Sequence, residues 1–184
     1  MQVATDADVK AMLGIDPLPK LGDFELVHMS GKVGSVIRVL QFLNGDGFRD
    51  YEHARLYVGN GKCLDAGPSG AKLGDLHQYD NVSHVWSTGV IPLTADQRFA
   101  IAVEGRKLVG TRYSFADYGS LAAKRLHIWV PGLDAYVASS KHMICSQAVA
   151  YAYMMGGYPL YSTFTGNVTP GDLAEWLAQH GKPC

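Results

Sequence analysis

The chain has 184 residues, of which 47% are hydrophobic and 18% are charged. This composition is typical of a globular protein, and the length suits one domain with a sizeable core, which we expect to cover residues 1–184 with its core at about 21–180. Sixteen basic and seventeen acidic residues give a net charge of −1 without any basic block, which argues against nucleic-acid binding.

The first half of the chain predicts short strands. Alternating apolar residues predict a strand at Asp23–Met29, whereas the spacing of apolar residues at 35–43 predicts a helix. Two further strands, at 53–58 and 62–66, are joined by Gly59-Asn60-Gly61, a turn rich in residues that accept positive φ. Two more strands are expected at residues 71–76 and 82–87.

The second half predicts helices. Thr94-x-x-Gln97 resembles a capping box and begins a helix expected to run through residue 109. Further helices are expected at 115–126 and 143–155, and Thr169-Pro170 is typical of the start of a last helix that Gly181 ends. Strands followed mostly by helices indicate an α+β domain.

Cys145 is the candidate nucleophile, because it lies in the first turn of the helix predicted at 143–155. The positive end of a helix dipole favours the thiolate and lowers the pKa of a thiol placed there. The polar neighbours Ser146 and Gln147 indicate a partly exposed position. An isolated Cys on an apolar helix is more often a small buried hydrophobic residue, so the assignment depends on partners elsewhere in the chain.

His53 and Asp65 are the candidate partners of Cys145. His53 begins one predicted strand and Asp65 lies near the end of the next, and these positions are neighbours across a two-stranded hairpin. The three residues supply the base, the orienting residue and the nucleophile of a cysteine hydrolase. The alternatives are a surface or capping role for His53 and a turn role for Asp65.

Two other sets of residues compete with this site. His142 lies three residues before Cys145 and is interpreted as a capping or rim residue, because nothing orients it. A zinc site of His53, Cys63, Asp65 and Cys145 lacks the Cys-x-x-Cys or His-x-x-x-His pairs typical of structural zinc sites. The chemistry of the three candidate residues requires neither a metal nor an organic cofactor.

Apolar segment length, the N-terminal charge pattern and the number of cysteines bear on the location of the protein. The apolar stretches are shorter than a membrane span, and residues 1–8 lack the basic and then apolar pattern of a signal peptide. Three cysteines are too few for a disulfide framework. We expect a cytoplasmic location by default, or a virus-associated protein released by another route, and the oligomeric state does not follow from the sequence.

Three segments, residues 21–27, 52–70 and 144–149, resemble the circularly permuted papain-like (NlpC-type) hydrolases. That family includes bacterial and viral amidase-like proteins and the lecithin:retinol acyltransferase-like enzymes. Its pattern is a Gly-Asp before the first strand, a His opening the next strand, a polar third residue closing the following one, and the Cys last, at a helix start. The third residue is often His or Glu, so the shorter Asp65 departs from the pattern and can alter how firmly His53 is held.

The resemblance implies a small antiparallel sheet packed on helices, with the cleft where the Cys145 helix meets the sheet. It implies attack on an acyl carbon through a covalent acyl-thioester, with His53 as base and Asp65 as orienting residue. The backbone N–H of Cys145 is a natural oxyanion donor in the first helical turn, and Tyr51 is a weaker candidate for a second donor.

Three functions are compatible with these residues. We expect a cysteine peptidase or amidase that cleaves an amide or peptide bond, such as one in a peptidoglycan fragment. One alternative is a lipid acyl hydrolase or acyltransferase with the same triad, acting on a lipid ester, which a long apolar groove would favour. The other is a binding or virion-assembly module without catalysis.

Overall fold

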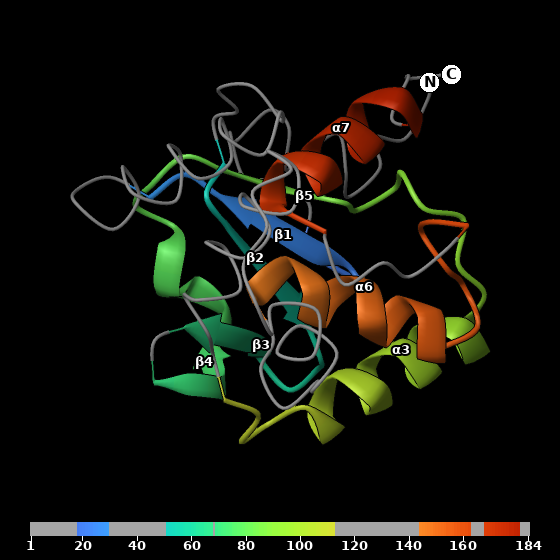
Figure 1. Cartoon of the computed structure of the whole chain (residues 1–184), viewed down its shortest axis with the longest axis horizontal. Helices are drawn as coiled ribbons and strands as arrows, with labels where there is room; N and C mark the ends of the chain where they lie inside the picture. The colour runs from blue at the N-terminus through green and yellow to red at the C-terminus, as the bar shows by residue number, and fades with distance from the viewer. Residues whose placement is uncertain (1–17, 30–50, 68, 113–143, 163–167, 181–184) are drawn as a thin grey trace, which may run out of the picture.

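The computed structural model describes residues 18–29, 51–67, 69–112, 144–162 and 168–180. Within these residues, three α-helices pack against a five-stranded antiparallel sheet with the order β4-β3-β2-β1-β5, an α+β arrangement (Figure 1). Two predicted helices lie outside the described ranges, those at residues 35–43 and 115–126. The same holds for three residues: His142, Gly181 and Cys184. The elements are β1 (Phe24–Val27), β2 (His53–Tyr57), β3 (Lys62–Gly67), β4 (Gly70–Asp75), a 3₁₀ turn η1 (Leu76–Tyr79), β5 (His84–Trp86), α3 (Ala95–Lys107), α6 (Cys145–Met155) and α7 (Pro170–His180).

The hairpin of β2 and β3 forms at the turn that the sequence predicts. Gly59, Asn60 and Gly61 have φ values of +88°, +57° and +65°, a left-handed region that glycine and asparagine adopt at low cost. The turn fixes an antiparallel register in which Arg55 lies opposite Asp65. The local sequence therefore determines which residues of the two strands face each other.

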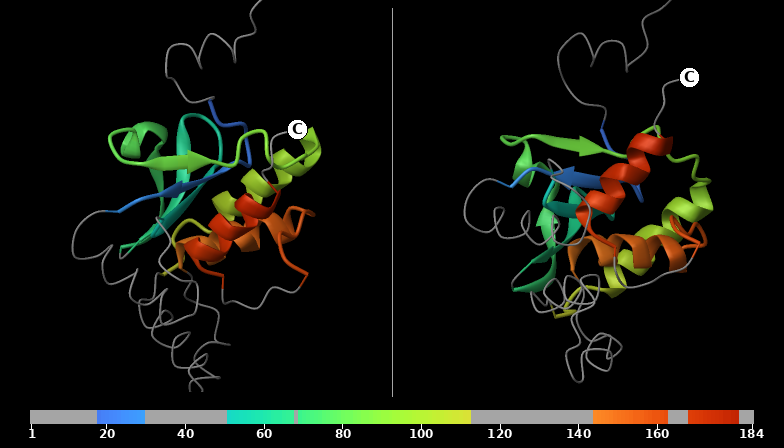
Figure 2. Two further views of the ribbon diagram at one scale, coloured as in Figure 1. Left: turned by 90° about the horizontal axis from the view of Figure 1, so that it is seen from above. Right: turned by 45° about the horizontal axis from the view of Figure 1, so that its top comes forward.

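One face of the sheet carries the apolar core. The three helices lie on this side of the sheet, as Figures 1 and 2 show. The ring of Phe24 in β1 contacts Tyr153 of α6 edge-on, with ring centroids 5.9 Å apart. The side chains that point this way are apolar and buried: Phe24, Leu26, Ala54, Leu56, Leu64 and Ala66.

The other face of the sheet is polar where η1 covers it, and the sequence did not predict this turn. The strand expected at 71–76 ends at Asp75, because the Asp75 side chain accepts a hydrogen bond of 3.0 Å from the His77 N–H and begins η1. The turn places Tyr79 over Arg55, whose guanidinium carbon lies 4.5 Å from the ring centroid. A buried arginine thus lies beneath a turn that sequence periodicity does not reveal.

Capping residues fix the starts of α3 and α7 as the sequence predicts. Thr94 and Gln97 form a reciprocal capping box at α3, which ends at Lys107 rather than at residue 109. At α7, the Thr169 hydroxyl accepts from the Asp172 N–H at 3.0 Å, and the Asp172 carboxylate accepts from the Thr169 N–H at 2.9 Å. These caps satisfy donors that the first turn of a helix leaves without intrahelical partners.

Asp23, part of the Gly-Asp pair before β1, joins β1 to α3. Its buried carboxylate accepts hydrogen bonds from Arg98 Nη1 at 2.7 Å, from Thr88 Oγ1 at 2.9 Å and from the Lys20 N–H at 2.8 Å. Asp23 therefore has a structural role that holds β1 in place.

Of the helices that the structure describes, none has the length and apolar character needed to cross a bilayer.

Candidate active site

Cys145 is the first residue of α6 and lies at the boundary between the helix and the sheet. The N–H of Ile144, the residue before it, donates to Gln147 Oε1 at 3.1 Å, and the Ser146 hydroxyl donates to the Val168 carbonyl oxygen at 2.7 Å. Both contacts hold the first turn of α6 in place. Cys145 is 1% exposed, and Ser146 and Gln147 are buried. The expectation of a partly exposed, polar position is therefore wrong, because these two side chains bond inward to the protein.

His53 and Asp65 contact each other across the β2–β3 hairpin. His53 lies two residues before Arg55, which faces Asp65, so that the two side chains lie on one face of the sheet. The Nε2 atom of His53 lies 2.9 Å from Asp65 Oδ1, within hydrogen-bonding distance, and both side chains are buried. The departure from the family pattern at Asp65 thus leaves the contact with His53 intact.

The same histidine is hydrogen-bonded to Cys145, so the structure brings the three predicted residues together. The Cys145 sulfur also accepts hydrogen bonds from the backbone N–H groups of Ala54 and Ser146. Sulfur therefore has three donors around it, from β2 and from the first turn of α6. Such donors stabilise the thiolate more than the thiol.

The pKa values of Cys145 and His53 shift in the directions that a thiolate–imidazolium pair requires. Burial by itself raises the pKa of Cys145, but the charge of His53 and the hydrogen bonds to sulfur lower it below its usual range. Burial by itself lowers the pKa of His53, but the Cys145 thiolate and Asp65 raise it to about 10. Both shifts favour a proton on His53 and a negative charge on Cys145.

Asp65 is itself held by a neighbour that the sequence analysis missed. Gln78 Nε2, in η1, donates to Asp65 Oδ2 at 3.3 Å, so that both carboxylate oxygens have partners. Burial raises the pKa of Asp65, but the hydrogen bond to His53 and the positive charges of His53, Arg55 and Lys72 together outweigh it, so the pKa is lowered. An added Cβ at Gly74 would lie 2.8 Å from Gln78 Oε1 and 3.3 Å from Asp65 Oδ2. Glycine at this position leaves room for the contact between Gln78 and Asp65.

A buried ion pair lies behind Asp65 on the same face. Arg55 Nε donates to Glu25 Oε2 at 2.7 Å, and its Nη1 and Nη2 atoms donate to the carbonyl oxygens of Asp75 and Leu76 at 2.8 and 3.1 Å. Burial raises the pKa of Glu25, although Arg55 acts in the opposite direction. The arginine therefore ties β2 to the start of η1, which carries Gln78. In the sequence, the signal that could have predicted this network is the presence of two opposite charges, Glu25 and Arg55, within predicted strands.

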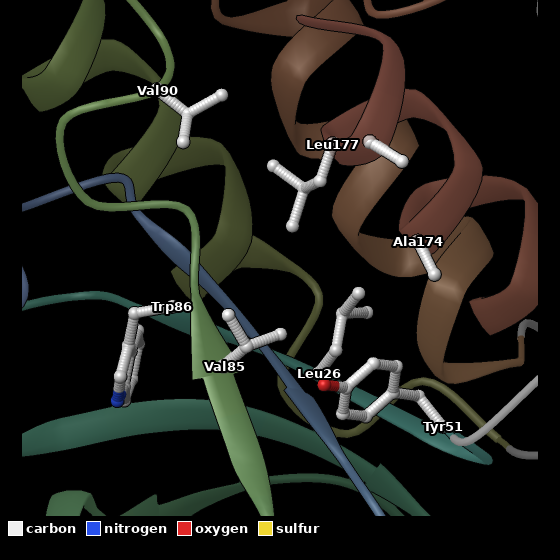
Figure 3. A pocket seen from close by; sticks show the side chains of 8 residues that line it. Leu26, Tyr51, Val85, Trp86, Val90, Ala174 and Leu177 are labelled. Carbon is white, nitrogen blue, oxygen red and sulfur yellow. The ribbon is translucent and has the colours of Figure 1, made fainter. Parts of the chain in front are cut away.

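Within the described residues, Cys63 has neither thiolate character nor the neighbours of a metal ligand, and Tyr51 lies in an apolar cleft. Burial raises the pKa of the Cys63 thiol to about 12, so it stays protonated at neutral pH. In the part of the chain that the structure describes, no cluster of three or more His, Cys, Asp or Glu side chains is arranged to hold a metal ion. Figure 3 shows the Tyr51 ring in an apolar cleft between β1, β5 and α7, and it is not assigned as an oxyanion donor.

Comparison with known proteins adds no relative: no family model, curated protein or solved structure matches this chain. The functional argument therefore depends on the residues of the site themselves.

Proposed function

We propose that this protein is a cysteine hydrolase that cleaves an amide or peptide bond, with Cys145 as nucleophile, His53 as acid and base, and Asp65 as orienting residue. The observation that carries the proposal is the chain of contacts from Cys145 to His53 and from His53 to Asp65, the latter at 2.9 Å. The order of elements, with the His and Asp strands before the Cys helix, also supports membership of the permuted papain-like hydrolases.

The acylation step follows from the charge distribution of the pair. The Cys145 thiolate attacks the carbonyl carbon, and the π electrons of the carbonyl move to its oxygen. When the tetrahedral intermediate collapses, the C–N bond breaks and the His53 imidazolium gives its proton to the leaving nitrogen. The products are an amine and an acyl-thioester on Cys145.

The negative oxygen of the intermediate is stabilised by the first turn of α6. The backbone N–H of Cys145 belongs to the residues whose N–H groups have no acceptor within the helix. The positive end of the helix dipole acts in the same direction. Donors of this kind typically contribute about 3–4 kcal/mol each to the stabilisation of the transition state.

Deacylation uses the same residues after the proton of His53 has gone to the leaving amine. His53, now neutral, takes a proton from water, and the resulting hydroxide adds to the thioester carbon. The S–C bond then breaks, a carboxylic acid leaves, and the thiolate–imidazolium pair is restored. Asp65 accepts the Nε2–H of His53 throughout, which leaves the other ring nitrogen, Nδ1, to exchange protons at the reacting atoms.

The test is detection of the acyl-enzyme. The protein is mixed with p-nitrophenyl acetate and with an N-acyl amino-acid amide, quenched in acid, and digested for mass spectrometry. We expect the acyl group on the peptide that contains Cys145, and loss of both adduct and turnover in Cys145→Ala. Cys63→Ala is the matched control, since it also removes a buried thiol but should retain the adduct. An adduct on another cysteine, or turnover that survives in Cys145→Ala, contradicts the proposal.

The same experiment separates the alternatives. A lipid acyl hydrolase or acyltransferase with this triad would form the adduct from long-chain glyceride esters in preference to amides. A non-catalytic binding or assembly module would form no adduct with any acyl donor. A panel of muramyl peptide, peptide amide and glyceride ester, compared by kcat/KM, ranks these substrate classes.

A further inference from the structure

Tyr79, in η1, lies on the polar face of the sheet and contacts two neighbouring side chains of β2. Its ring centroid lies 5.9 Å from that of His53, with the two ring planes at 64°, and the Arg55 guanidinium carbon lies 4.5 Å from the same centroid. His53 and Arg55 are two positions apart on one strand, so both side chains point to this face. The Tyr79 ring therefore spans the candidate base and the buried arginine.

The position of the Tyr79 ring is fixed by a buried ion pair. Arg55 donates to the carbonyl oxygens of Asp75 and Leu76, which ties the start of η1 to β2. Its guanidinium lies against the Tyr79 ring, where the π electrons attract the cation. Arg55 is itself held by Glu25, whose Oε2 atom accepts from the arginine Nε at 2.7 Å. The ring thus rests on a side chain that is buried and paired.

The imidazole of His53 needs such a support, because its two nitrogens have separate partners. Nε2 lies 2.9 Å from Asp65 Oδ1, and the ring is also hydrogen-bonded to Cys145. Rotation about the χ2 torsion would break both contacts. The preferences of this torsion are broad, so rotamer energies by themselves do not hold the ring. A side chain packed against the imidazole limits the rotation, and Tyr79 occupies that position.

The same ring lies where water would reach the hydrogen bond between His53 and Asp65. These residues are 5% and 4% exposed, although they lie on the face of the sheet opposite to the apolar core. Burial raises the pKa of the Tyr79 hydroxyl and the charge of Asp65 acts in the same direction, so the two groups are close. Opposite charges attract about four times more strongly at an effective dielectric constant of about 20 than in water. Loss of the ring would therefore weaken the attraction between Asp65 and protonated His53.

We propose that Tyr79 is a positioning residue of the hydrolase: its ring holds the His53 imidazole between Asp65 and Cys145 and keeps water from the His53–Asp65 hydrogen bond. This inference rests on the proposed hydrolase function and adds to it a residue that acts through His53. The contacts with His53 and with Arg55 both belong to the ring. Phenylalanine at position 79 should therefore serve as well as tyrosine.

The kinetic test compares Tyr79→Leu with Tyr79→Phe, using p-nitrophenyl acetate as the substrate. Tyr79→Leu removes the ring and should lower kcat by about tenfold or more with little change in KM, because a misplaced base slows the chemical step. Tyr79→Phe keeps the ring and should retain kcat. Tyr158→Leu is the matched control, since it removes another half-buried tyrosine ring, one that packs against Tyr153, and should leave kcat unchanged. Equal kcat values in Tyr79→Leu and Tyr79→Phe overturn the proposal.

A second readout tests the shielding without turnover. The Nε2–H proton of His53, which is hydrogen-bonded to Asp65, is observed by NMR in Cys145→Ala, and its exchange with water is measured. We expect a slowly exchanging signal in this background that Tyr79→Phe and Tyr158→Leu retain. In Tyr79→Leu the signal should be lost through exchange, because water reaches the hydrogen bond. A signal that persists in folded Tyr79→Leu refutes the shielding role.

The two readouts separate a failure of this inference from a failure of the hydrolase mechanism. Ester turnover that survives in Cys145→Ala refutes the mechanism, and proton exchange at His53 then decides by itself whether Tyr79 shields the hydrogen bond. If the adduct forms on Cys145 but the exchange is the same in Tyr79→Leu and Tyr79→Phe, the mechanism stands and the role of Tyr79 is refuted. Tyr79→Met keeps more of the side-chain volume and replaces Tyr79→Leu in both measurements if that variant does not fold.

Discussion

Removal of the Cys145 sulfur should lower the pKa of His53. In the folded protein burial acts to lower this pKa, and the Cys145 thiolate is the largest of the influences that raise it to about 10, followed by Asp65. The variant Cys145→Ala retains the burial and the hydrogen bond to Asp65 at 2.9 Å, and it removes the adjacent negative charge. The pKa of His53 therefore reports directly on the thiolate–imidazolium pair, without any substrate.

The expected size of this change follows from the interaction of two adjacent charges. Two unit charges about 4 Å apart, at an effective dielectric constant of about 20, interact by about 4 kcal/mol. Since one pKa unit corresponds to about 1.36 kcal/mol, the pKa of His53 should fall by about three units in Cys145→Ala. In Asp65→Asn a neutral acceptor replaces a charged one, so a charge interaction and part of the hydrogen bond are lost; the pKa of His53 should also fall, but by less than in Cys145→Ala, because the thiolate is the larger of the two influences.

The assay is an NMR titration of the histidine rings, with the His53 signal assigned by its absence in His53→Gln. Cys63→Ala is the control, because the Cys63 thiol has a pKa of about 12 and its removal takes no charge away below that pH. By linkage, His53→Gln must raise the pKa of Cys145 by the same coupling free energy, measured from the pH dependence of alkylation. An unchanged His53 pKa in Cys145→Ala, or an equal fall in Cys63→Ala, refutes the ion pair.

Three further predictions concern pH, the support of Asp65 and the anchoring of β1. Amide turnover should fall as pH rises through about 10, because His53 there loses the proton that it gives to the leaving group. Alkylation of Cys145 by iodoacetamide needs no such proton and should not fall in this pH range. A parallel decline of turnover and alkylation would contradict the assigned role of His53. Gly74→Ala, whose Cβ would displace Gln78, should lower kcat by up to about tenfold, and Gly67→Ala, where an added Cβ meets nothing within 4 Å, should not. Equal kcat values in these two variants would show that Gln78 does not position Asp65. Asp23→Ala leaves Arg98 without its carboxylate and should lower the free energy of unfolding by about 3 kcal/mol in urea denaturation, while kcat of the folded fraction is retained.

The sequence by itself determined the local parts of the structure. The Gly59-Asn60-Gly61 turn set the hairpin, and the hairpin register brought His53 and Asp65 to one face because strand side chains alternate with a period of two. The Thr94 and Thr169 caps set the starts of α3 and α7. Each of these features depends on residues within a few positions of one another or on one short hairpin.

Only the tertiary structure decided how deeply the candidate site is buried and what supports it. Cys145 reaches His53 and Ala54 across about 90 residues of sequence, and its 1% exposure depends on packing that no local pattern encodes. The contact of Gln78 with Asp65 arises because the Asp75 cap ends β4 one residue before the position expected from apolar alternation. Burial of the pair of Arg55 and Glu25 requires partners from separate strands and η1, since a buried charge is tolerated only when it is paired. Local sequence set the strand faces and helix starts, whereas long-range packing determined solvent exclusion and brought together the charges and hydrogen bonds that, against burial, set the direction of the pKa shifts at Cys145, His53 and Asp65.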